Sequence, residues 1–185
     1  MKTNENIALY VLRLAGTLFL IAAVVAALLA GVNAVTAPVI AELNAAATQE
    51  AISAVLPGGF DSEITDYADA SGIVSKVYQG ANGYALEVGP GGFDNTITMM
   101  VGVDNEGKVL GISIVNHTET AGLGAVADAD TPKGIAFREQ FIGTSGSVAV
   151  SKAGGTLDAI TGATITSRAI CVGVNAALDC VAGLG

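Results

Sequence analysis

Charged side chains are missing from one long segment near the N-terminus. No Asp, Glu, Lys or Arg occurs between Arg13 and Glu42, and charged residues make up only 14% of the chain, where about a quarter is usual in soluble domains. Leu14–Val32 is a mostly apolar run inside this gap. At about 1.5 Å per residue, a helix over this run, completed by Asn33–Val35, would cross the ~30 Å hydrocarbon core of a bilayer. We therefore predict a transmembrane helix over residues 14–35.

The alternative for this segment is a cleaved signal peptide, because Lys2 and Arg13 could form its basic start and residues 32–34 could form a cleavage site. The run is longer than the ~7–15 residues of a signal core, which favours a retained anchor. After Arg13 the next basic residue is Lys76. Because basic residues stay on the cytoplasmic side, this asymmetry predicts a cytoplasmic N-terminus over residues 1–13 and an extracytoplasmic domain at the cell (inner) membrane.

Cysteine, histidine and basic residues are also scarce. Cys171 and Cys180 fall on opposite faces of a predicted helix, about 13 Å apart along its axis, which excludes a disulfide between them. The single histidine, His117, has no Cys or His partner at the spacing of a metal site. With only eight Lys and Arg residues and a net charge of -9, the chain has no basic cluster. The composition therefore argues against a bound metal and against nucleic-acid binding.

The uncharged segment is followed by a second helical pattern. Thr36 is a predicted N-cap with Pro38 in the first turn. Apolar residues then recur at helical spacing until Pro57 and the two glycines after it. We predict a helical stalk over residues 36–57.

Alternating apolar and polar residues predict strands in the next part of the chain. The strands are expected at residues 73–79, 84–88, 96–103 and 109–116, with a further candidate at 147–150. Asp104–Gly107 is a hairpin turn signal between two of them. Helices are predicted over residues 131–142 and 167–181. The expected fold is α+β, in which the transmembrane helix and stalk precede an antiparallel-sheet domain over residues 58–185 with a C-terminal packing helix.

The segment Asp158–Ser167 (DAITGATITS) carries the clearest chemical signal. Small residues and hydroxyl groups stand before a predicted helix N-terminus, where unpaired N–H groups and the helix dipole favour an anion. Gly162 and Ala163 would let a ligand approach the backbone, and Thr161 and Thr164 add hydroxyl groups. Taken alone, the pattern fits a phosphate site or an ordinary helix capped by threonine or serine.

The first nine residues of this segment, Asp158–Thr166, resemble the flavinylation motif of the G subunits of Rnf electron-transport complexes and of the related C subunit of sodium-translocating NADH:quinone reductase. The resemblance implies that FMN is joined covalently to Thr166 through a phosphoester bond. It also implies a flavin transferase that uses FAD and magnesium to install the group. By the same resemblance Thr161, Gly162, Ala163 and Thr164 lie beside the flavin phosphate.

A second motif supports the same family. Asn116–Gly124 (NHTETAGLG) resembles the family segment His-x-Glu-Thr-Pro-Gly-Leu-Gly, with Ala121 in place of the usual proline. The resemblance implies that Thr120 and Leu123 line the flavin, and Glu119 is assigned to the cofactor site with them. Lys152 matches a lysine near the phosphate or the isoalloxazine ring.

The resemblance implies one flavin carrier in a membrane complex that passes electrons between ferredoxin and NAD and moves Na⁺ or H⁺. Its partners would be the other proteins of the Rnf complex (RnfA, RnfB, RnfC, RnfD and RnfE). No acid–base pair or activated nucleophile is predicted, so no catalytic residue is assigned. Two alternatives stay open. One is the quinone-reductase protein or a stand-alone anchored flavoprotein, and the other is a binding module that carries no FMN.

Overall fold

The computed structural model describes residues 2–184, which divide into two units at Ala46 and Ala47. A single helix, α1 (Lys2–Val55), begins in the first unit and ends in the second. The remaining elements all belong to the second unit. They are, in order, β1 (Ser62–Ile64), β2 (Val74–Gly80), β3 (Gly83–Val88), β4 (Thr98–Asp104), β5 (Val109–Asn116), η1 (Gly124–Ala127), α2 (Pro132–Glu139), η2 (Ser151–Ala153) and α3 (Thr164–Leu184).

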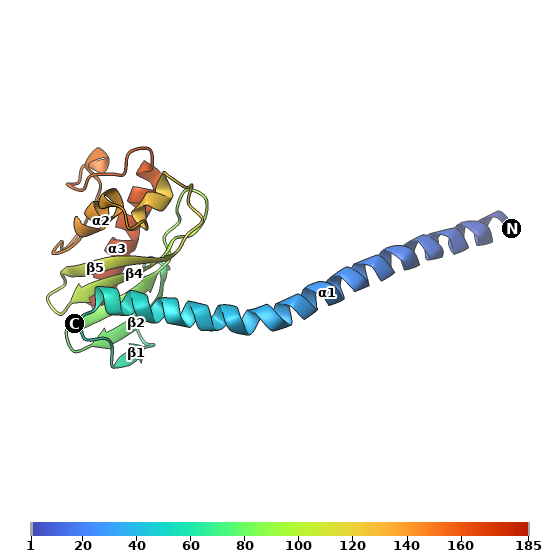
Figure 1. The fold of residues 1–185 in the computed structure, drawn as a ribbon, viewed down its shortest axis with the longest axis horizontal. Coiled ribbons are helices and arrows are strands. Elements are labelled where there is room, and N and C mark those ends of the chain that lie inside the picture. The colour runs from blue at the N-terminus through green and yellow to red at the C-terminus, as the bar shows by residue number, and fades with distance from the viewer. Residues whose placement is uncertain (1, 185) are drawn as a thin grey trace. The chain divides into compact units, whose positions relative to one another are not determined.

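The first unit consists of α1 up to Ala46, which Figure 1 shows as part of one uninterrupted helix. The predicted helix start at Thr36 is therefore wrong. The Thr36 hydroxyl donates to the Val32 carbonyl one turn earlier, at 3.1 Å, so it does not act as an N-cap. Pro38 lies inside the helix. Helix formers on both sides of these residues allow the helix to propagate through a local start signal.

The second unit is built on a five-stranded sheet in the order β1-β2-β3-β4-β5, with every neighbouring pair antiparallel. Each strand thus pairs with the next one in the sequence (Figure 1). The predicted hairpin turn Asp104–Gly107 joins β4 to β5 as expected. Together with the C-terminal helix α3, this sheet confirms the predicted α+β class.

The two faces of the sheet are covered by different helices. Val77, Leu86 and Met99 point to the face that packs against α3, where Ile170 and Val174 are completely buried. The residues next to them in each strand point to the other face and pack against the last turns of α1. These contacts join Ala51, Ile52, Val55 and Leu56 to Tyr78, Ala85 and Met100. Successive residues of a strand alternate between faces. Because apolar residues occupy neighbouring positions in β2, β3 and β4, these strands carry apolar side chains on both faces.

Three element predictions needed correction. Residues 147–150 form no strand of the sheet, because the Asn175 side chain on α3 hydrogen-bonds both the N–H and the carbonyl of Val148 at 2.8 and 2.9 Å. The helix predicted to end at residue 142 ends at Glu139, where the chain tightens into turns with bonds three residues apart. The final helix starts at Thr164, three residues before its predicted start.

Strand β1 was not predicted, because it has only three residues and no alternating pattern.

Candidate functional site

The loop before α3 is fixed by hydrogen bonds to a buried serine. The Ser167 hydroxyl accepts from the Ile160 N–H at 3.0 Å and donates to the Ala163 carbonyl at 2.9 Å. The Ala163 N–H in turn donates to the Ile160 carbonyl at 2.9 Å. Ser167 has no solvent exposure. These bonds close residues 160–163 into a turn that leads directly into the helix and fixes the direction of its first residues.

Thr166 is the third residue of α3, and its hydroxyl contacts a carboxylate from a distant part of the chain. Its Oγ1 donates to Oε2 of Glu119 at 2.5 Å, across 47 positions of sequence. Both side chains are nearly buried, with 2% exposure for Thr166 and 7% for Glu119. Thr166 was predicted to lie ahead of the helix, but because α3 begins at Thr164 it lies in the first turn. The structure brings together two of the residues predicted for the cofactor site.

The second oxygen of Glu119 is held by a backbone loop. Oε1 accepts from the N–H of Phe93 at 2.7 Å and from that of Asp94 at 3.4 Å. Two glycines make room for the carboxylate, because a Cβ on Gly92 or on Gly124 would overlap a carboxylate oxygen of Glu119. The Glu119 side chain is thus held by contacts with Thr166, with the loop at residues 92–94 and with Gly124.

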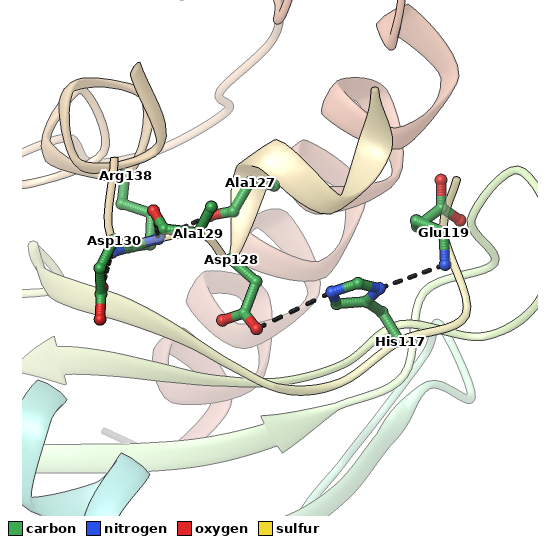
Figure 2. A network of polar contacts seen from close by, with 7 residues as sticks. All are labelled: His117, Glu119, Ala127, Asp128, Ala129, Asp130 and Arg138. Carbon is green, nitrogen blue, oxygen red and sulfur yellow. Dashed lines mark hydrogen bonds and ion pairs between the residues drawn. The ribbon is translucent and has the colours of Figure 1, made fainter. Parts of the chain in front are cut away.

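His117 supports the backbone of Glu119, as Figure 2 shows. Its Nδ1 accepts from the Glu119 N–H at 3.2 Å, while its Nε2 lies 3.8 Å from Asp128 Oδ2. Arg138 fixes the segment that carries Asp128, since its guanidinium donates to the carbonyls of Ala127 and Ala129 at 2.8 and 3.2 Å. Among the described residues no group of three or more His, Cys, Asp or Glu side chains could hold a metal ion. The histidine holds the loop in place.

A cavity of about 400 Å³ opens beside Thr166. It is lined by most of the predicted site residues: Glu119, Thr120, Leu123, Lys152, Gly162, Ala163, Thr164 and Thr166. Three apolar side chains at its margin are unusually exposed for their type, namely Phe93 (65%), Leu123 (44%) and Ile165 (52%). One end of the cavity therefore carries hydroxyl groups, and its margin is apolar.

A neighbouring cavity of about 550 Å³ contains the rest of the motif. Thr161 and Asp158 line this second cavity, so the structure separates them from Thr166. Gln140 holds Asp158 through both backbone groups, accepting from its N–H at 2.7 Å and donating to its carbonyl at 3.2 Å. The larger cavity contains neither Thr166 nor Glu119, so we place the functional site in the smaller one.

The residues present fit a flavin mononucleotide in most respects. A ring system needs exposed apolar surface, which Phe93, Leu123 and Ile165 supply. A phosphate is favoured by the first N–H groups of a helix, which lack partners inside the helix, and α3 begins here with Thr164. The Lys152 side chain adds a positive charge to the cavity lining. The Glu119 carboxylate is the one group that would repel a phosphate on Thr166.

The sequence did not indicate Phe93, Gly92 or Gln140, and it gave Ser167 no role beyond a helix start. It also did not pair Glu119 with Thr166. The pairing depends on how β5 leads residues 117–124 across the start of α3, which no local pattern contains.

Comparison with known proteins adds independent information. Residues 92–179 match an FMN-binding domain, and residues 2–55 match the RnfG N-terminal region. The chain is 32% identical to the G subunit of the Na⁺-translocating ferredoxin:NAD⁺ oxidoreductase complex of Acetobacterium woodii, over 97% of both chains. It is 32% identical to the G subunit of an ion-translocating oxidoreductase complex of Methanosarcina acetivorans, over 89% of this chain and 91% of the relative. A Pseudomonas aeruginosa protein with that same name is 34% identical over 90% and 86%.

Proposed function

The chain belongs to the family of G subunits of ion-translocating oxidoreductase (Rnf) complexes, and from this membership we propose that it relays electrons through FMN attached covalently to Thr166. The observation that supports this assignment is the Thr166 hydroxyl at the hydroxyl-bearing end of the 400 Å³ cavity. The acceptor atom is positioned on the first turn of a buried helix, so a group attached there would be held by the core of the domain.

The cofactor would supply the redox chemistry, because a flavin can accept electrons in pairs and release them one at a time. The protein would bind and orient it. Leu123 and Phe93 offer apolar contacts to the ring system and would limit its contact with water. Gly162, Ala163 and Thr164 lie where the phosphate would meet backbone or hydroxyl groups, and Thr120 and Lys152 complete the cavity wall.

We further propose that α1 anchors the chain in the membrane over residues 14–35, with residues 36–57 as a stalk and residues 58–185 as the flavin domain. The most apolar part of α1 is long enough to cross a bilayer and is not buried within the described structure. The distribution of Lys2, Arg13 and Lys76 supports a cytoplasmic N-terminus and an extracytoplasmic domain.

The proposed partners are the other proteins of the Rnf complex and a flavin transferase. The match of residues 2–55 to the RnfG N-terminal region favours this complex over a quinone reductase, because it covers the segment that would lie in the membrane. The chain would be one carrier inside the complex, and NAD and ferredoxin would bind elsewhere.

The test is intact-mass spectrometry of the full-length chain produced together with the family's flavin transferase. We expect an added mass of one FMN less one water, together with flavin fluorescence in a denaturing gel. Thr166→Ala should lose both signals completely. Thr164→Ala is the matched control, because it removes a hydroxyl from the same turn and should leave both signals intact. Loss of the signals in Thr164→Ala alone would show that the wrong threonine was assigned.

The Thr166→Ala chain should still fold. Removing the hydroxyl leaves Glu119 Oε2 without its donor, which costs about 1–3 kcal/mol when a buried polar group loses its partner. A circular-dichroism melt distinguishes this loss from unfolding. If the unmodified Thr166→Ala protein supported full electron transfer in the assembled complex, the proposed carrier role would be wrong.

A further inference from the structure

We propose that Glu119 is the proton acceptor for the Thr166 hydroxyl when the flavin phosphate is attached. This inference rests on the proposed function, since it concerns the formation of the Thr166 phosphoester. It changes the assignment of Glu119 from a residue that lines the cofactor to a catalytic residue supplied by the acceptor protein. It also departs from the sequence analysis, which predicted no acid–base pair or activated nucleophile and assigned no catalytic residue.

The geometry is that of a nucleophile and its base. A hydroxyl is a weak nucleophile, and it is activated by a base within about 2.6–3.2 Å that a third group orients. Thr166 Oγ1 lies 2.5 Å from Glu119 Oε2, and the Phe93 N–H holds the other carboxylate oxygen at 2.7 Å. A bond of this length is typical of a hydroxyl that donates to an ionised oxygen. The three groups therefore form a relay of nucleophile, base and orienting donor.

The surroundings keep the carboxylate on its target. Glu119 is 7% exposed, and a side chain on Gly92 or Gly124 would overlap its carboxylate oxygens. His117 fixes the backbone of the same residue through the Glu119 N–H. No ion pair of Glu119 with a basic side chain occurs within residues 9–184. Its hydrogen-bonding capacity is directed to Thr166 and to the Phe93 loop.

The step balances without any oxidant or reductant. The donor is a flavin dinucleotide held by the transferase with magnesium. A bond forms between Thr166 Oγ1 and the phosphorus of the flavin half, the anhydride bond to the adenylate half breaks, and AMP leaves. The hydroxyl proton passes to Glu119 Oε2. No atom changes its oxidation state.

The same transfer resolves the one misfit in the site. An ionised Glu119 would repel a phosphate attached to Thr166, because Oε2 lies 2.5 Å from the Oγ1 atom that would carry the phosphorus. A Glu119 that has taken the proton is neutral and can donate a hydrogen bond to an ester oxygen. The residue that accepts the proton thus becomes a donor to the product.

The arrangement also explains which threonine is the acceptor. Thr161 is exposed and lines the other cavity, and Thr164 is half-buried. Within the described residues, Thr166 is the threonine of the motif whose hydroxyl bonds a carboxylate. Glu119 therefore selects the reacting hydroxyl as well as activating it.

The test is the rate of flavin attachment to the purified full-length chain, with the transferase, FAD and magnesium, followed by intact mass. Glu119→Gln keeps the shape and one oxygen for the Phe93 N–H but cannot accept the proton. We expect kcat to fall about 100-fold, as for the loss of a general base, while KM for the acceptor chain changes less than about twofold. Glu106→Gln, in the exposed turn before β5, is the matched control and should react as the unaltered chain does.

Glu119→Asp gives a second measurement if the glutamine variant folds poorly. It keeps the charge but withdraws the carboxylate by one methylene, so kcat should fall by about 10-fold with KM unchanged. A raised KM with unchanged kcat in either variant would show that Glu119 only shapes the loop, and equal rates in Glu119→Gln would also overturn the proposal. If the unaltered chain gained no flavin at Thr166, the proposed function itself would fail instead.

Discussion

The chain contains two long apolar helices that have different surroundings. Both α1 and α3 are long and apolar enough to cross a membrane by composition. In the most apolar window of α1, 0% of the residues are buried, whereas 67% are buried in that of α3. Apolar length therefore does not decide what a helix does here. The deciding feature is whether other parts of the folded domain bury the side chains of the helix.

The difference has a physical reason in the residue pattern. Residues 14–32 are apolar around the whole helix, which is typical of a segment solvated by lipid. Helix α3 alternates instead between a buried face, with Ile170, Val174 and Leu178, and exposed positions such as Arg168 and Val172. One arginine substitution, placed at three positions, tests this comparison.

The largest effect is expected from Val174→Arg in α3. Val174 is completely buried between the helix and the sheet, and an unpaired charge cannot be accommodated there. Destabilisation beyond about 4–5 kcal/mol is typical of this class of change, so we expect the domain to be unfolded at room temperature. Urea denaturation followed by circular dichroism measures it. A cooperative transition with unchanged midpoint would contradict the assignment of α3 as a core helix.

A smaller but specific effect is expected from Val24→Arg in α1. An arginine at the centre of a membrane-spanning helix costs about 2.5–3.5 kcal/mol in insertion. The variant should shift from the membrane to the soluble fraction while the flavin domain keeps its melting temperature. Val172→Arg, at a 53% exposed position of α3, is the control and should change neither quantity. Equal membrane recovery of Val24→Arg would argue against residues 14–35 as the anchor.

The smallest effect concerns the thiol of Cys171 on the covered helix. Burial raises the pKa of this thiol to about 11 from 9.0. The unfolded chain thus loses its thiol proton at lower pH than the folded chain does. The resulting stabilisation is complete below about pH 9 and is lost as pH rises towards 11, by at most about 1.4 kcal/mol per pH unit. Cys171→Ala should flatten this decline in denaturation curves between pH 9 and 11, and an unchanged slope would show that the thiol is not protected.

The fold was predictable where a local pattern determined it. Strands β2 to β5 and the hairpin at Asp104–Gly107 were found because alternation and turn residues act over a few positions. The boundaries that failed depend on distant contacts. The segment at 147–150 has a strand-like sequence, but Asn175 binds its backbone instead. The Thr36 signal was overridden by the helix on either side.

The site was predictable through its motifs and not through its geometry. The residues assigned to the flavin were found by resemblance, and most of them line one cavity. The contact between Thr166 and Glu119 could not be predicted, because it joins the first turn of α3 to a loop that follows β5. For the same reason Thr161 was grouped with Thr166, although the turn closed by Ser167 directs it into the neighbouring cavity.

The order of the site residues along the chain has a consequence for biosynthesis. The sheet pairs only sequential neighbours, so it can form as each hairpin is completed. Phe93 and Glu119 precede Thr166 in the chain, and Thr166 lies in α3, the last of the described helices. A nascent or truncated chain would lack the proposed acceptor site until α3 has been synthesised and has packed on the sheet. If the flavin is attached at Thr166 as proposed, it would therefore mark only copies in which α3 has packed on the sheet, and a chain interrupted before α3 would carry no flavin there.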